Sequence, residues 1–72
     1  MDYKQVLQDL YDSEINISMY WEWDSGCTIE IGASYNVQDS YNSDDLTKCF
    51  SWLINRVIEL YPKSEFHKKY YA

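Results

Sequence analysis

The stretch that decides the fold of this chain spans residues 15–35 and reads INISMYWEW, DSG and CTIEIGASY. In the first segment, apolar residues occupy every second position from Ile15 to Trp23, which predicts a β-strand with one buried face. Asp24-Ser25-Gly26 predicts a three-residue hairpin loop, because Gly suits the position that needs a positive φ. Residues 27–35 alternate again, so the stretch predicts an antiparallel hairpin.

The predicted register places Trp23 opposite Cys27 and keeps the apolar side chains on one side of the hairpin. On the other side, Tyr20 faces Glu30, and the neighbouring pair is Glu22 with Thr28. The residues predicted to face the core are Ile15, Ile17, Met19, Trp21, Trp23, Cys27, Ile29, Ile31, Ala33 and Tyr35.

Residues 37–41 allow two interpretations. They form either a short third strand at the edge of the sheet or an irregular extension of the second strand. A two-residue turn at Tyr35-Asn36 would direct Gln38 and Ser40 toward the core, whereas a three-residue turn would direct Asp39 there.

A long helix is predicted to follow the sheet. Asn42 or Ser43 caps its start, and the acidic pair 44–45 suits the first turn. Pro62 ends the helix, and Ser64 caps a final turn that carries Phe66. The buried stripe of the long helix is predicted to comprise Leu46, Cys49, Phe50, Leu53, Val57, Leu60 and Tyr61.

The elements together predict an α+β fold: an N-terminal helix, an antiparallel β-hairpin or three-stranded sheet, and a C-terminal helix packed on one sheet face. Asp2 caps the first helix, which ends near residues 11–13. Residues 1–72 are predicted to form one domain with a short basic aromatic tail at 62–72, because so short a chain holds no second core. The outer sheet face stays in water because its residues are polar.

Charge is divided unevenly along this chain, whose net charge is −6. Residues 1–45 hold ten acids and one base, whereas residues 46–72 hold five bases and two acids. This acidic balance disfavours direct contact with nucleic acid or anionic membranes, both of which attract Lys and Arg. It favours a basic protein partner. The lack of a signal-peptide pattern or a long apolar run predicts a cytoplasmic protein.

No pattern in the sequence indicates catalysis or a bound metal or cofactor. Cys27 and Cys49 lie on predicted core faces, where a thiol acts as a small apolar group. Together with His67, they lack the spacing of a zinc site. The tail mixes bases and aromatic residues, a weak feature of nucleic-acid binding, and is interpreted as a solubilising terminus.

The predicted partner-binding surface lies on the outer sheet face. Tyr20 points outward there, and Tyr is enriched at protein interfaces. Glu22, Glu30, Asp24 and Asp39 add negative charge that suits a basic partner site. In the alternative interpretation, a cross-strand pair of Tyr20 and Glu30 only stabilises the hairpin.

The acidic composition, the exposed acids and tyrosines, and the order helix–hairpin–helix across residues 2–61 resemble small phage-encoded inhibitor proteins of the anti-CRISPR type. Some of these are DNA mimics that occupy the basic groove where a CRISPR effector holds DNA. The resemblance implies an inhibitor that blocks a basic nucleic-acid-binding site, and it carries over no individual functional residue. The long helix followed by Tyr61-Pro62 and the tail is also similar to uncharacterised prophage proteins.

The sequence therefore favours a phage-encoded, protein-binding inhibitor that acts against a defence of the host. One alternative is an immunity protein or antitoxin that neutralises a basic nuclease. A second is a prophage domain that acts as a homodimeric interaction module. An enzyme is disfavoured, because a 72-residue domain with a filled core has little room for a pocket.

Overall fold

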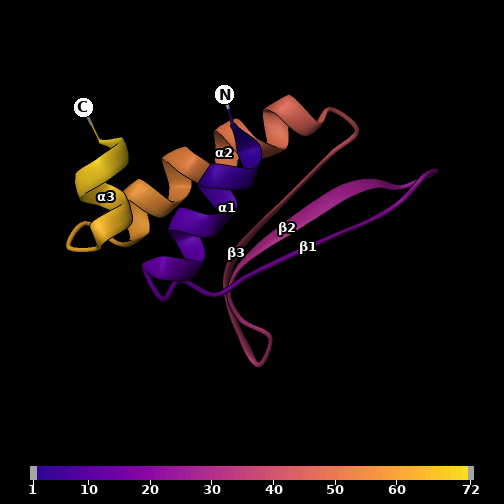
Figure 1. The fold of residues 1–72 in the computed structure, drawn as a ribbon. Helices are drawn as coiled ribbons and strands as arrows, with labels where there is room; N and C mark the ends of the chain where they lie inside the picture. The colour runs from indigo at the N-terminus through magenta and orange to yellow at the C-terminus, as the bar shows by residue number, and fades with distance from the viewer. Residues whose placement is uncertain (1, 72) are drawn as a thin grey trace.

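The structure is a computed structural model that describes residues 2–71. A three-stranded antiparallel sheet in the order β1-β2-β3 carries the helices on one side (Figure 1). The α+β prediction is confirmed, and residues 37–41 do belong to a third strand. The elements are α1 (Tyr3–Asp12), β1 (Ile17–Glu22), β2 (Gly26–Ala33), β3 (Asn36–Ser43), α2 (Leu46–Leu60) and α3 (Glu65–Tyr70).

The hairpin of β1 and β2 is offset by two residues from the predicted register. Trp21, not Trp23, lies opposite Cys27, and the loop comprises residues 23–25. Gly26 belongs to β2 and takes a φ of +81°. An offset of two residues leaves the same side chains facing the core. The prediction was therefore right about the face of the paired residues and wrong about the pairing. It was also wrong for Trp23 and Tyr35, which lie in the loops between the strands and are 94% and 92% exposed.

A β-bulge lies in the pairing of β2 with β3. Gly32 pairs with Val37 and Ile31 pairs with Asp39, so Gln38 has no counterpart on β2. The extra residue reverses the direction of the following side chains, and Asp39 faces the helices although the turn is of the two-residue kind. Gly32 takes a φ of +113° at this point.

Side-chain caps begin the first two helices. The Asp2 carboxylate accepts the Gln5 N–H at 3.2 Å, as predicted. Asp45, rather than Asn42 or Ser43, caps α2, and its carboxylate accepts the Thr47 N–H at 2.9 Å. The prediction placed this cap too early because β3 continues to Ser43. A cap of this kind stabilises a helix by about 1 kcal/mol.

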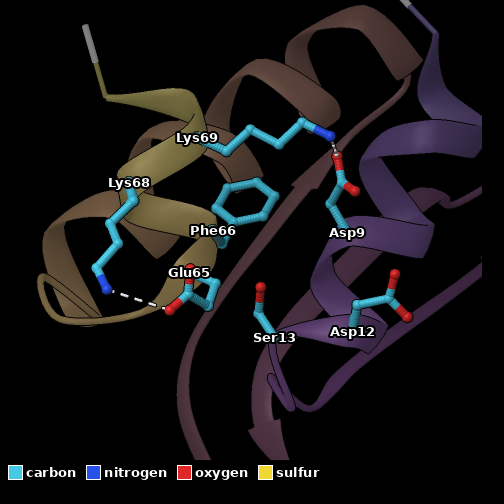
Figure 2. Close-up of a pocket in the computed structure, with 7 residues that line it drawn as sticks. All are labelled: Asp9, Asp12, Ser13, Glu65, Phe66, Lys68 and Lys69. Carbon is cyan, nitrogen blue, oxygen red and sulfur yellow. Dashed lines mark hydrogen bonds and ion pairs between the residues drawn. The ribbon is translucent and has the colours of Figure 1, made fainter.

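The C-terminal tail is a folded helix, which corrects its interpretation as a solubilising terminus. Ser64 caps α3, as predicted, by accepting the His67 N–H at 3.0 Å. Phe66 is 1% exposed and belongs to the core. Lys69 reaches across to α1 and pairs with Asp9 at 2.9 Å (Figure 2). The tail is therefore part of the packed structure.

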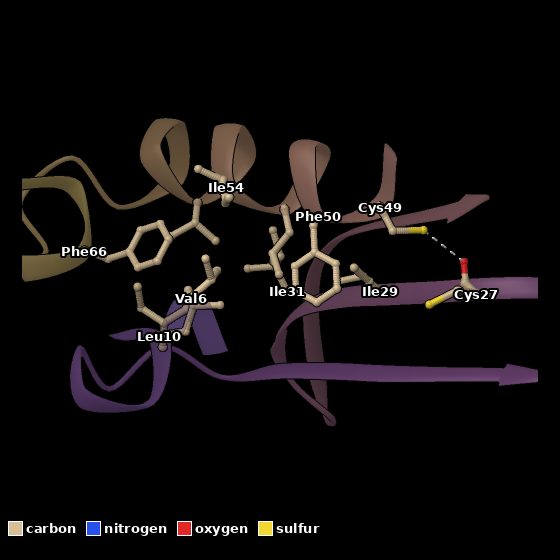
Figure 3. Packing of buried hydrophobic residues seen from close by; sticks show 12 residues of the cluster. Val6, Leu10, Cys27, Ile29, Ile31, Cys49, Phe50, Ile54 and Phe66 are labelled. Atoms are coloured by element: carbon tan, nitrogen blue, oxygen red, sulfur yellow. Dashed lines mark hydrogen bonds between the residues drawn. The ribbon is translucent and has the colours of Figure 1, made fainter. Parts of the chain in front are cut away.

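The core lies between the sheet and the helices (Figure 3). Tyr3 of α1 stacks on Phe50 of α2 with ring centroids 4.1 Å apart, which joins the two helices. The Cys49 thiol lies 3.6 Å from the carbonyl oxygen of Cys27, which joins α2 to β2. The buried hydrophobic residues are Val6, Leu10, Ile15, Cys27, Ile29, Ile31, Cys49, Phe50, Leu53, Ile54, Val57 and Phe66.

Candidate protein-binding surface

The sheet face turned away from the helices is where the structure brings three predicted site residues together. Tyr20 is 53% exposed, and its hydroxyl donates to Glu30 Oε2 at 3.4 Å. Tyr20 lies opposite Thr28 on the backbone, so this contact is diagonal and not the direct pair that was predicted. Glu22, two residues further along β1, lies on the same side of the sheet. We call this surface the outer sheet face.

A polar bridge fixes the middle of the outer sheet face. The Asn42 side-chain amide donates to Thr28 Oγ1 at 2.9 Å and to the Ser25 carbonyl at 3.1 Å. It therefore ties β3 to β2 and to the hairpin loop. Cross-strand contacts of this kind contribute about 0.2–1 kcal/mol each and hold the strands in one register.

The other two predicted site residues lie elsewhere. Asp24 is exposed in the hairpin loop and accepts the Ser25 hydroxyl at 3.3 Å. Asp39 lies on the opposite side of the sheet, where Arg56 Nε donates to its Oδ2 at 2.6 Å. Arg56, and then the Ser40 N–H, hold the pKa of Asp39 below its ordinary value. The bulge therefore separates Asp39 from the acids of the outer sheet face.

Two tryptophans that were predicted to be buried are exposed at the end of the hairpin. Trp21 is 65% exposed and Trp23 is 94% exposed, and Leu46, a predicted core residue of the long helix, is 51% exposed. Together with Glu22 and Asp44 they border an open hollow of about 300 Å³. We call Trp21, Trp23, Asp24, Asp44 and Leu46 the hairpin end.

The length of the hairpin explains why sequence reasoning missed this exposure. An alternating stretch of nine residues, 15–23, spans about 30 Å, whereas α1, with ten residues, spans about 15 Å. The long helix starts at Leu46 and lies against β2 and β3. Neither helix covers the far end of β1. The alternating stretch is about twice as long as α1, and this difference is the feature of the sequence from which an exposed aromatic end could have been predicted.

An acid on α1 is held by three groups and is not available to a partner. Tyr70 Oη donates to Asp9 Oδ2 at 2.5 Å, and the Lys69 ammonium lies 2.9 Å from the same oxygen. Gln5 Nε2 donates to Asp9 Oδ1 at 2.9 Å. The Tyr70 hydroxyl first, and then Lys69, lower the pKa of Asp9 to about 2. Burial first, and then Asp9, raise the pKa of Tyr70 to about 12.

These pKa values predict how stability depends on pH. The folded-state pKa of Asp9 lies below its ordinary value of 3.8, so its stabilisation is complete above pH 4 and is lost as the pH falls toward 2. The pKa of Tyr70 is raised from 10, so its stabilisation is complete below pH 10 and is lost as the pH rises toward 12. Urea unfolding measured from pH 2 to 12 checks both expectations.

Two variants separate the contributions of this pair. Asp9→Asn should remove the part of the loss of stability in acid that Asp9 causes and leave the part that Asp39 causes. Tyr70→Phe should shrink the acid dependence of stability and remove the part of the alkaline dependence that Tyr70 causes, because it removes the donor to Asp9 and the titrating hydroxyl together. An Asp9→Asn protein whose stability falls as steeply in acid as the parent would contradict this assignment.

The two cysteines lie in the core, away from the outer sheet face. Burial, and then Cys27, raise the pKa of Cys49, which keeps this thiol protonated and poorly nucleophilic. Both cysteines are free and buried, as the sequence predicted. Within the described part of the chain, no group of three or more His, Cys, Asp and Glu residues is arranged to hold a metal ion.

No protein-family model, curated protein or solved structure matches this chain. The helices of residues 2–71 are all too short or too polar to cross a bilayer.

Proposed function

We propose that this protein is an acidic protein-binding inhibitor that occupies a basic site on another protein. The distribution of charge over the elements carries the proposal. Residues 17–43, which form the sheet and its loops, contain the acids Glu22, Asp24, Glu30 and Asp39 and no base. The bases Lys4, Lys48, Arg56, Lys68 and Lys69 lie in the helices, and Lys63 lies between α2 and α3.

Exposed aromatic rings lie among these acids. Tyr20 stands between Glu22 and Glu30 on the outer sheet face, and Trp23 stands beside Asp24 in the hairpin loop. Tyr and Trp are enriched among the residues that contribute most to binding at protein interfaces, while surrounding charges steer the encounter. Acids beside exposed aromatic rings support docking on a cationic groove that also binds aromatic rings. A groove that binds nucleic acid has that character, which supports an anti-CRISPR-like inhibitor acting as a DNA mimic.

Charge reversal tests the proposal against a panel of CRISPR effectors and basic nucleases. For a protein that the parent binds, Glu22→Lys/Glu30→Lys should slow association by about tenfold or more at low salt, because steering raises association rates by about 10–10³. The difference between parent and variant should shrink near 0.15 M salt, where the Debye length is about 8 Å. Stopped-flow or surface-plasmon-resonance kinetics give both values.

A second charge reversal serves as the matched control. Asp12→Lys/Glu14→Lys changes the net charge by the same amount, but Asp12 is the last residue of α1 and Glu14 follows its C-cap, so both positions lie outside the sheet. If the two double variants slow association equally, overall charge and not the outer sheet face guides binding. Binding to a nuclease but to no CRISPR effector would move the proposal to an immunity protein or antitoxin.

A further inference from the structure

β1 has a free edge that is ready to pair with another strand. It is the first strand in the order β1-β2-β3, so β2 covers only one of its two edges. Figure 1 shows β1 as the outermost strand, with the helices over one face of the sheet. In residues 2–71, no loop or side chain outside the sheet ladder forms a hydrogen bond with the backbone of 17–22, apart from the turn bond to Glu22.

The direction of the free backbone groups follows from one hydrogen bond. The Gly32 N–H donates to the Asn16 carbonyl at 2.8 Å, so these two residues form a hydrogen-bonded pair. Such pairs alternate along an antiparallel ladder with pairs that do not exchange hydrogen bonds. Ile17, Met19 and Trp21 therefore direct their N–H and C=O groups away from β2, toward the free edge.

This edge lacks the features that usually prevent strands from pairing. β1 contains no Pro, no Lys and no bulge, and its one charged residue, Glu22, stands at its end. By contrast, β3, at the other edge of the sheet, contains the bulge at Gln38 and the charged Asp39. Natural edge strands are usually protected by such charges, bulges or prolines. The two edges of the sheet are thus protected unequally.

We propose that two copies of this protein pair through β1 in antiparallel orientation, about a two-fold axis at Met19, to form one six-stranded sheet. In this register Met19 exchanges hydrogen bonds with Met19 of the second copy. Ile17 does so with Trp21 of the second copy, and Trp21 with Ile17. An interface about a two-fold axis uses the same surface twice, so it must be complementary to itself.

A protruding side chain at one end of β1 and a hollow at the other end provide that complementarity. At one end, Trp21 is 65% exposed on the helix-bearing side. At the other end, an open hollow of about 280 Å³ lies between α1 and the start of β1. Its apolar rim includes the exposed residues Leu7 and Tyr11, together with Ile17. Antiparallel pairing brings Trp21 of each copy to Ile17, and so to this hollow, on the other.

The charges along β1 are compatible with pairing. On the outer sheet face, Tyr20 lies opposite Ser18 of the second copy, and Glu22 lies opposite Asn16, so no acid of β1 faces another acid. The two Trp21 rings, each 65% exposed before pairing, can together bury on the order of 300 Å², and the two strand edges and the apolar rims of the two hollows add further contact area. The pairing leaves the outer sheet face uncovered and makes it continuous across both copies.

Two substitutions at the centre of the edge test the pairing. Met19→Pro and Met19→Ala remove the same side chain, but only proline also removes the N–H that the second copy needs. That N–H points away from β2, and proline is tolerated at such a position of an edge strand. We expect Met19→Ala to dimerise, and Met19→Pro to bind itself about tenfold or more weakly. Sedimentation equilibrium, against a chain mass of 8.7 kDa, measures both, and circular dichroism verifies that each variant is folded.

Amide exchange of the unmodified protein provides a second measurement that requires no substitution. As concentration rises from about 1 to 500 µM, the amides of Ile17, Met19 and Trp21 should gain protection. Those of Ser18 and Tyr20, which face β2, should stay protected throughout. A protein that remains monomeric over this range overturns the inference, as does a Met19→Pro protein that dimerises like Met19→Ala. These readouts involve no partner, so they can fail while the proposed function stands.

Discussion

Gly32→Ala is expected to lower the free energy of unfolding by about 3 kcal/mol, the sum of backbone strain and a steric clash. Gly32 takes a φ of +113°, a conformation that residues with a side chain rarely adopt. A Cβ atom there would lie 2.6 Å from the Asn36 carbonyl oxygen and 3.0 Å from the Gln38 nitrogen. Both are backbone atoms of the bulge, so they cannot move aside without changing the pairing of β3. Urea denaturation measures the loss.

Gly26→Ala provides a graded comparison for this prediction. Gly26 has a φ of +81°, but a Cβ atom there would meet its nearest neighbour, the Ser43 carbonyl oxygen, at 3.1 Å. We expect a loss of about 1–2 kcal/mol from the left-handed backbone conformation. Gly32→Ala should therefore be clearly the more damaging of the two. Equal losses would mean that the bulge does not depend on the absence of a side chain at position 32.

Phe66→Ala is expected to destabilise the fold by about 3–5 kcal/mol, the usual cost of removing a buried aromatic ring. Phe66 is 1% exposed, and its ring stacks on Tyr70 with centroids 4.1 Å apart. For a domain of this size, total stability is on the order of 5 kcal/mol, so the substitution removes most of it. Thermal unfolding should show a fall of about 10 °C or more in the midpoint.

Tyr71→Ala is the matched control in the same short helical region. Tyr71 is 64% exposed, and its ring stacks on His67 at the surface. Its removal should change the free energy of unfolding by no more than about 0.5 kcal/mol. If Phe66→Ala were equally mild, α3 would not be part of the cooperative core, and the interpretation of residues 62–72 as a solubilising tail would return.

Local patterns were sufficient to predict the hairpin and the first two helices, but they left residues 37–41, now part of β3, open between two interpretations. Alternation identified the hairpin, Asp2 and Ser64 were recognised as caps, and Pro62 marked the end of the long helix. The buried positions of Cys27 and Cys49 also followed from these patterns. Each of these signals acts over a few residues, which is the range at which sequence determines structure most directly.

The incorrect predictions depended on contacts between distant parts of the chain. Alternation cannot show how far along a strand the helices reach, so Trp21 and Trp23 were assigned to the core. The bulge depends on the conformation of Gly32, and it decides that Asp39 meets Arg56 instead of the outer sheet face. For the candidate site, the sequence indicated Tyr20, Glu22 and Glu30 as neighbours, but alternation alone did not indicate the exposed aromatic residues of the hairpin end.

The contacts between α3 and α1 have a consequence for the order in which the protein is assembled during synthesis. Tyr70 and Asp9 are 61 positions apart, and Lys69 reaches the same carboxylate. A ribosome adds about 5–20 residues per second from the N-terminus onward. After Asp9 is added, α1 therefore waits while 61 further residues are added, the last of which is Tyr70, the donor to the Asp9 carboxylate.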